Sequence, residues 1–126
     1  MTDLKLLYVD DEADIREVAT FSLELDPGIE VRSAGGGVEA FAMLDGDDWR
    51  PDVVLLDVMM PDMDGPAVLA RLRERGDLNG APVIFITARA QAEERARLLG
   101  FGAADVITKP FDPMTLAQDV RAILAR

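Results

Sequence analysis

The chain has 126 residues, of which 49% are hydrophobic and 29% are charged, and it carries a net charge of -11 at pH 7. This length fits one domain, and the composition is that of a globular protein rather than a disordered one. The absence of cysteine and histidine excludes disulfides, thiolate and imidazole metal sites, cysteine nucleophiles and serine–histidine triads. The acidic charge disfavours nucleic acid as a direct partner, because such binding depends on lysine and arginine contacts to phosphate.

No apolar stretch approaches the roughly 20 residues that span a bilayer, and the N-terminus lacks a basic segment followed by a long apolar one. We therefore expect a cytoplasmic protein without a membrane partner.

Strand-like and helix-like segments alternate along the chain. In chain order, we expect a strand at Leu4 to Val9, a helix at Asp14 to Leu25, a strand at Ile29 to Ser33, a helix at Gly37 to Leu44, a strand at Val53 to Leu56, a helix at Pro66 to Arg75, a strand at Val83 to Ile86, a helix at Ala92 to Leu99, a strand at Asp105 to Thr108 and a helix at Pro113 to Leu124. The first, third and fourth strands are near-continuous apolar runs, as in central parallel strands, whereas the second alternates like an edge strand.

Several residues mark the expected helix ends. Pro66 suits a first helical turn, and Asp112-Pro113 is expected to cap and open the last helix. Gly28, Gly76 and Gly100 are expected to close helices in the left-handed conformation. The repeated strand–helix pattern predicts an α/β fold, a doubly wound five-stranded parallel sheet with strand order 2-1-3-4-5 and five helices, covering residues 1–126 as one domain.

Charged residues recur where the predicted strands end. Asp10 and Asp11 follow the first strand, Asp57 the third and Lys109 the fifth. Because ligands bind outside the carboxyl ends of strands in an open parallel sheet, we expect these three carboxylates and one ammonium to share a site.

Adjacent carboxylates favour a hard divalent cation such as Mg²⁺, although capping of the next helix by Asp10, Asp11 or Glu12 is the simpler alternative. Asp57 strengthens the metal hypothesis, because a buried strand delivers it to the same edge, where an aspartate can ligand metal or attack phosphorus. Thr87 and Lys109 would suit phosphoryl oxygens as a hydroxyl donor and a point charge.

Four motifs at the strand ends resemble the receiver domain of two-component response regulators. They are Tyr8-Val9-Asp10-Asp11-Glu12, Asp57-Val58-Met59-Met60-Pro61-Asp62-Met63-Asp64-Gly65, Ile86-Thr87-Ala88 and Thr108-Lys109-Pro110-Phe111. The resemblance covers nearly the whole chain. It implies a flavodoxin-like fold and an aspartate that accepts a phosphoryl group from a phosphohistidine on a sensor histidine kinase or histidine phosphotransfer protein.

By this resemblance Asp57 is the phosphoacceptor. Asp11 would bind Mg²⁺ directly, Asp10 would act mainly through a bound water, and the backbone carbonyl of Met59 would be a further ligand. Lys109 would contact the phosphoryl group, and its peptide bond to the next residue, a proline, would be cis.

The family switch pairs a threonine, here Thr87, with an aromatic residue three positions before the lysine. This chain has Val106 at that position, so we expect switching to use the loop from Thr87 to Gln91 and the following helix instead. Met59 and Arg89 occupy the positions that flank the approach of attacking water. Since methionine orients water poorly and arginine can shield a phosphoryl group, we expect a long-lived phosphorylated state.

The resulting expectation is a receiver domain without an output domain, which phosphorylates itself from its donor and is otherwise not an enzyme. Its downstream target would be a protein bound at the face of the fourth helix, fifth strand and fifth helix, roughly Ala92 to Leu124, or a second copy in a phosphorylation-dependent homodimer. One alternative is a docking or dimerisation module that does not depend on phosphorylation. An aspartyl-phosphate phosphohydrolase is a weaker alternative, since Met59 stands where that class needs a second aspartate.

Overall fold

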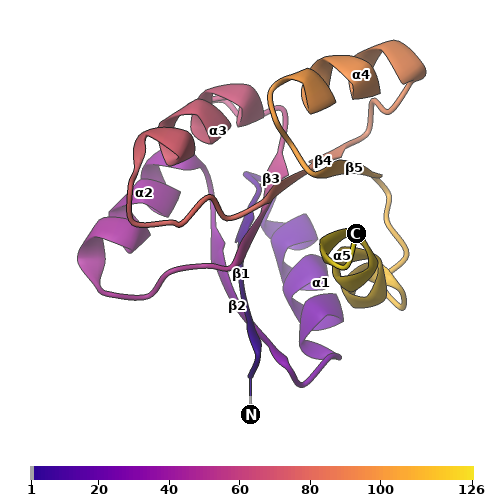
Figure 1. Cartoon of the computed structure of the whole chain (residues 1–126). Helices are drawn as coiled ribbons and strands as arrows, with labels where there is room; N and C mark the ends of the chain where they lie inside the picture. The colour runs from indigo at the N-terminus through magenta and orange to yellow at the C-terminus, as the bar shows by residue number, and fades with distance from the viewer. Residues whose placement is uncertain (1) are drawn as a thin grey trace.

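The computed structural model describes residues 2–126, in which five parallel strands alternate with five helices. The elements are β1 (Leu4–Val9), α1 (Ala13–Glu24), β2 (Ile29–Ala34), α2 (Gly37–Gly46), β3 (Val53–Asp57), α3 (Gly65–Glu74), β4 (Val83–Thr87), α4 (Ala92–Gly100), β5 (Asp105–Thr108) and α5 (Leu116–Leu124). The strands pair in parallel in the order β2-β1-β3-β4-β5, which confirms the predicted topology and the edge position of β2 (Figure 1).

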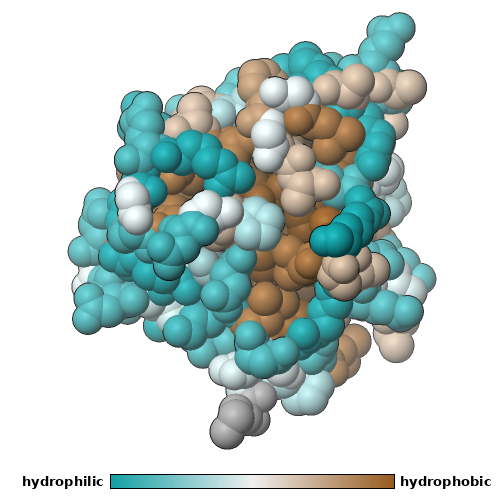
Figure 2. All heavy atoms as spheres, viewed as in Figure 1, coloured by the Kyte–Doolittle hydropathy of each residue, from teal (hydrophilic) through white to brown (hydrophobic). Residues whose placement is uncertain are grey.

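The helices cover both faces of the sheet, with α1 and α5 on one face and α2, α3 and α4 on the other (Figure 1). Successive residues of a strand point to opposite faces, so Leu55 packs in the core beneath α1 and α5 while Leu56 packs in the core beneath the other three helices. This double burial is why β3, β4 and residues 6–9 of β1 carry apolar residues without alternation. Figure 2 shows apolar surface running through the middle of the viewed face, with polar residues around it.

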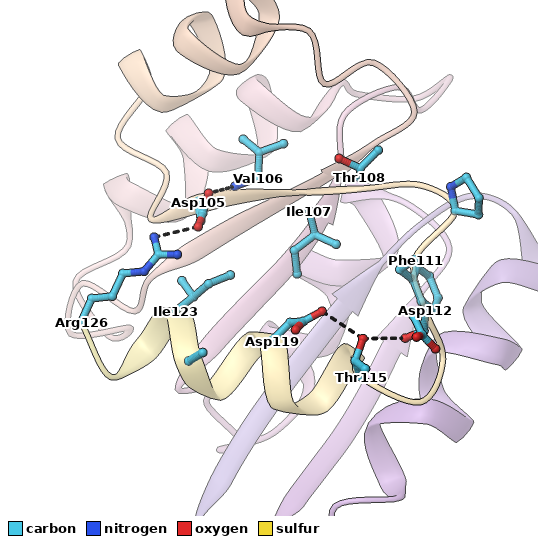
Figure 3. Close-up of a pocket in the computed structure, with 12 residues that line it drawn as sticks. Asp105, Val106, Ile107, Thr108, Phe111, Asp112, Thr115, Asp119, Ile123 and Arg126 are labelled. Atoms are coloured by element: carbon cyan, nitrogen blue, oxygen red, sulfur yellow. Dashed lines mark hydrogen bonds and ion pairs between the residues drawn. The ribbon is translucent and has the colours of Figure 1, made fainter.

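The last helix starts later than expected. Residues 113–115 form a turn, and α5 begins at Leu116 rather than at Pro113. Asp112 does not cap the helix directly: its side chain accepts the N–H of Met114 at 2.9 Å, while its backbone carbonyl accepts the N–H of Thr115 at 3.1 Å. The same carbonyl also faces the hydroxyl of Thr115 at 3.5 Å (Figure 3). The aspartate thus closes a turn of its own before the helix, which the pattern Asp-Pro does not distinguish from a cap.

The prediction that three glycines close helices in the left-handed conformation is also wrong. Among residues 2–126, a left-handed φ occurs at Asn79, Gly80 and Gly102, and not at Gly28, Gly76 or Gly100. In α4 the helix ends later than predicted, because Gly100 is still helical. The residue that closes this helix in the left-handed conformation is Gly102, whose N–H donates to the carbonyl of Leu99.

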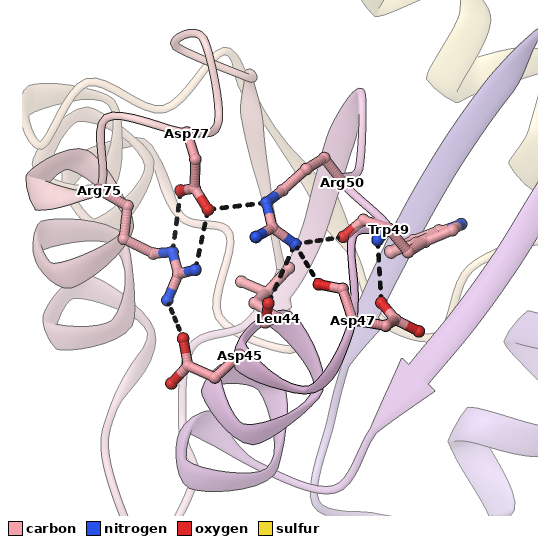
Figure 4. Close-up of polar contacts among 7 residues, drawn as sticks. All are labelled: Leu44, Asp45, Asp47, Trp49, Arg50, Arg75 and Asp77. Atoms are coloured by element: carbon pink, nitrogen blue, oxygen red, sulfur yellow. Dashed lines mark hydrogen bonds and ion pairs between the residues drawn. The ribbon is translucent and has the colours of Figure 1, made fainter.

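A network of opposite charges lies at the amino ends of β3 and β4, and we call it the amino-edge network (Figure 4). Arg75 lies 3.0 Å from Asp77 and 2.8 Å from Asp45, and the Nε of Arg50 lies 2.7 Å from Asp77. Arg50 also donates to the carbonyl of Leu44 at 3.0 Å, which satisfies an acceptor near the end of α2. The network therefore ties the ends of α2 and α3 to the loops that enter the sheet.

Within residues 2–126, every helix is too short or too polar to cross a bilayer.

Candidate functional site

The carboxyl edge of the sheet collects charged side chains from three strands. Asp10 follows β1, Asp57 ends β3 and Lys109 follows β5. The Nζ of Lys109 lies 2.8 Å from Oδ2 of Asp10, 3.3 Å from Oδ1 of Asp57 and 3.8 Å from Oε1 of Glu12. The structure thus brings residues separated by almost the whole chain into direct contact.

Asp10, Asp11 and Asp57 form a cluster, which we call the acidic cluster. Each offers one carboxylate oxygen, and these oxygens lie within 4.8 Å of one another. Asp10 is fully buried and Asp57 is 6% exposed, whereas Asp11 is exposed to solvent. An all-oxygen donor set with one open side fits Mg²⁺, which takes one or two carboxylates and keeps several waters.

Burial makes the acidic cluster electrostatically unusual. Desolvation raises the pKa of Asp57 to about 6, with a further contribution from the charge of Asp10 and partial relief from Lys109. Burial acts to lower the pKa of Lys109, but the hydrogen bond and charge of Asp10, together with Asp57, outweigh it and leave that pKa raised. Lys109 therefore keeps its positive charge at neutral pH, and Asp57 is largely ionised there.

Thr87 is the last residue of β4 and is buried. Its hydroxyl accepts the N–H of Arg89 at 3.0 Å, and its backbone carbonyl accepts the N–H of Lys109 at 2.8 Å. The β4–α4 loop therefore starts beside the backbone of Lys109. The Lys109-Pro110 bond is cis, as expected.

Met59 and Arg89 are both exposed, and they line one hollow between the β3–α3 loop and α4. Asp64 and Arg97 lie along the same hollow. Val106, by contrast, is buried and packs in the core beneath α2, α3 and α4 together with Phe85 and Leu98. Its backbone carbonyl accepts a hydrogen bond from Arg95 of α4 at 3.2 Å.

The helix-capping alternative accounts for only part of the geometry. Glu12 is the N-cap of α1, but its side chain makes no capping bond. Oδ1 of Asp10 accepts the N–H of Glu12 at 3.0 Å, so Asp10 does order the start of the helix while its other oxygen faces Lys109.

Two contacts of Asp10 were missed at the level of sequence. The hydroxyl of Tyr8 donates to Oδ2 of Asp10 at 3.0 Å, and Arg16 donates to the backbone carbonyl of Asp10 at 2.7 Å. Burial and the adjacent Asp10 charge raise the pKa of Tyr8, so the phenol keeps its proton. The signal for Tyr8 is its spacing, because residues two apart in a strand share a face.

The chain is similar in sequence to known response regulators. The family model described as the response regulator receiver domain matches residues 6–121. Response regulator MprA of Mycobacterium leprae is 42% identical over 123 residues, which are 98% of this chain and 52% of that protein. The chain thus spans about half the length of the curated relatives it matches.

Solved structures agree in fold. Chemotaxis response regulator CheY4 of Vibrio cholerae superposes with a TM-score of 0.85 at 32% identity, covering 97% of this chain and 99% of that one. The receiver domain of the Francisella response regulator 1452 gives a TM-score of 0.83 at 31% identity, covering 98% of each chain.

Proposed function

Because this chain belongs to the response regulator receiver domain family of two-component signalling, we propose that Asp57 accepts a phosphoryl group from a phosphohistidine on a sensor histidine kinase or histidine phosphotransfer protein. The observation that carries this proposal is the contact of Lys109 with both Asp10 and Asp57 at the carboxyl edge of the sheet. It joins a buried nucleophilic carboxylate to a fixed positive charge beside further carboxylates.

In the proposed transfer, a carboxylate oxygen of Asp57 forms a bond to phosphorus while the bond between phosphorus and the donor's imidazole nitrogen breaks. The electron pair of that bond leaves with the imidazole, so no other reactant is needed. Asp57 is suited to the step because its pKa of about 6 leaves it ionised at neutral pH. Lys109 would then loosen its contacts with Asp10 and with Asp57, now an acyl phosphate, and contact a phosphoryl oxygen instead.

Asp10, Asp11 and Asp57, with the backbone carbonyl of Met59, would hold Mg²⁺. When bound, this ion would neutralise charge on the phosphoryl oxygens. The three side chains support the assignment because their oxygens already converge within 4.8 Å. Carboxylates this close repel one another unless a cation balances them.

The switch we propose begins at Thr87, whose hydroxyl proton would donate to a phosphoryl oxygen. Such a movement would pull on the N–H of Arg89, to which the hydroxyl is bonded, and so on the loop that leads into α4. Val106 has no aromatic ring to swing inward and is already buried. If Val106→Ala left phosphorylation-dependent partner binding unchanged, position 106 would be no part of the switch.

The proposed output surface is the face of α4, β5 and α5, where a downstream protein or a second phosphorylated copy would bind. Asp105 at the start of β5 pairs with Arg95 of α4 and with Arg126 beyond α5, at 2.7 Å for the latter (Figure 3). The buried carboxylate of Asp105 thus links β5 to α4 and to the residue that follows α5. A shift of α4 would therefore change the ion pairs that connect these elements.

We further propose that the phosphorylated state is long-lived, because methionine, here Met59, orients water poorly and arginine, here Arg89, can pair with a phosphoryl group and shield it. Loss of phosphate within seconds from the purified protein in Mg²⁺ would contradict this. Arg89→Ala should shorten the lifetime.

The function is tested with a small-molecule phosphodonor. Acetyl phosphate with Mg²⁺ should add one phosphoryl group to the wild type by intact mass, and none to Asp57→Asn. Asp77→Asn, an equal change at the opposite end of the sheet, should be phosphorylated normally. No mass gain in the wild type, with partner binding also indifferent to beryllofluoride, would favour the docking module, and repeated turnover of phosphate esters would favour the phosphohydrolase.

A further inference from the structure

The side chain of Asp10 is fully buried, and its two oxygens receive three donors. Oδ1 accepts the N–H of Glu12 at 3.0 Å. Oδ2 is shared, because it accepts the Tyr8 hydroxyl at 3.0 Å and also lies 2.8 Å from the Lys109 ammonium. Oδ2 of Asp10 therefore has two side-chain donors, the Tyr8 hydroxyl and the Lys109 ammonium.

Tyr8 and Lys109 differ in how tightly their side chains are packed. The Tyr8 ring is 1% exposed and packs in the core beneath α1 and α5, so its hydroxyl is held in one place. Lys109 has a flexible stem, is 13% exposed and reaches three carboxylates. Of the two donors, Tyr8 is the one that the packing of the core holds against Asp10.

The proposed function requires Lys109 to move. Once a phosphoryl group is present on Asp57, the ammonium must reach its oxygens and loosen its contact with Asp10. A buried carboxylate oxygen left without a donor is costly, so a site in which Lys109 alone served Oδ2 would retain the lysine on Asp10.

From this geometry we propose that Tyr8 is a positioning residue of the site: its hydroxyl holds Oδ2 of Asp10 so that Asp10 stays oriented toward the acidic cluster when Lys109 leaves it. The inference rests on the proposed function, since it assumes that Asp10 serves a Mg²⁺ site. Outer partners that orient metal ligands commonly change metal affinity by about 10- to 100-fold.

The substitution that isolates the hydroxyl is Tyr8→Phe, which keeps the buried ring. Calorimetric titration with Mg²⁺ should show affinity at least about tenfold weaker than in the wild type. Phosphorylation by acetyl phosphate should slow at low Mg²⁺ and recover at saturating Mg²⁺. The matched control is Ile84→Val, a mild change in the same core cluster that removes no polar group, and it should shift Mg²⁺ affinity less than about twofold.

A spectroscopic signature separates positioning from packing. Tyr8 is the only tyrosine of the chain. Its near-ultraviolet difference spectrum should therefore change on addition of Mg²⁺, with the same midpoint as the calorimetric titration, because the acceptor of its hydroxyl is perturbed.

The outcomes are distinct. If wild type binds Mg²⁺ and is phosphorylated while Tyr8→Phe does both with unchanged Mg²⁺ dependence, the positioning role is wrong and the proposed function stands. If Tyr8→Phe and Ile84→Val weaken Mg²⁺ binding equally, the role is merely structural and the inference is again overturned. If wild type itself binds no Mg²⁺, the proposed metal site fails, and the inference fails with it.

Discussion

The two edges of the sheet use the same residue types for opposite purposes. At the amino edge, each aspartate of the amino-edge network faces an arginine, and the hydrogen bond from Arg75 lowers the pKa of Asp77 (Figure 4). At the carboxyl edge, three aspartates lie close to one another and only one lysine contacts them, and burial raises the pKa of Asp57. The exposed charges of the amino-edge network are thus paired with opposite charges, whereas the carboxylates of the acidic cluster outnumber the one lysine beside them.

The difference predicts that removing a carboxylate changes the free energy of unfolding in opposite directions at the two edges. Because burial raises the pKa of Asp57, we expect the ionised acidic cluster to lower the stability of the unliganded protein at neutral pH. The amino-edge network should contribute a little stability and no function.

The largest effect is expected for Lys109→Met, which removes the only lysine at the carboxyl edge. It leaves Asp10 and Asp57 buried without their cation, so the free energy of unfolding should fall by about 3 kcal/mol. Urea denaturation in a chelating buffer measures this. Lys5→Met, a change of the chain's other, exposed lysine, is the control and should change stability little. Equal losses in the two variants would show that the ammonium does not neutralise the acidic cluster.

Asp57→Asn should change the free energy of unfolding in the opposite direction, so that the unliganded protein becomes more stable. The native pKa is raised to about 6, so between roughly pH 4 and pH 6 the native state keeps a proton that the unfolded chain has released, and stability falls as pH rises through this window. Replacing the carboxylate should therefore stabilise the unliganded protein at pH 7 by about 1–2 kcal/mol, after allowance for screening by water. Urea midpoints from pH 4 to pH 7 should diverge with rising pH, and parallel curves would refute the account.

Asp77→Asn should have the smallest effect and the reverse pH dependence. Its pKa is lowered, so the carboxylate contributes stability above its unfolded pKa, and that contribution is lost as pH falls through the native value. The variant should be slightly less stable than wild type at pH 7 and equal to it in acid. Added salt should shrink the difference at pH 7. A loss as large as that of Lys109→Met would mean that the amino edge is more than an exposed ion-pair network.

Sequence reasoning predicted the topology and the convergence of Asp10, Asp57 and Lys109, because parallel strands deliver their carboxyl ends to one edge whatever the details of packing. It was wrong where local conformation depends on tertiary context. Asp112 closes a turn before α5, and α4 continues through Gly100.

The contacts that sequence reasoning missed depend on how side chains and helices pack in three dimensions. The bond from Tyr8 to Asp10 requires both the face of the strand and the rotamer of a buried ring. The link from Asp105 to Arg95 and Arg126 depends on how α4 and α5 pack beside β5. A linear pattern records neither.

The central claim is that the buried, cation-poor edge is the phosphoryl-accepting site, and locating the phosphoryl group tests it most directly. After reaction with acetyl phosphate and Mg²⁺, reductive trapping of the acyl phosphate followed by peptide mass spectrometry should mark Asp57 in the wild type and nothing in Asp57→Asn. A mark on any other carboxylate of the wild type, or one that persists in Asp57→Asn, would contradict the account.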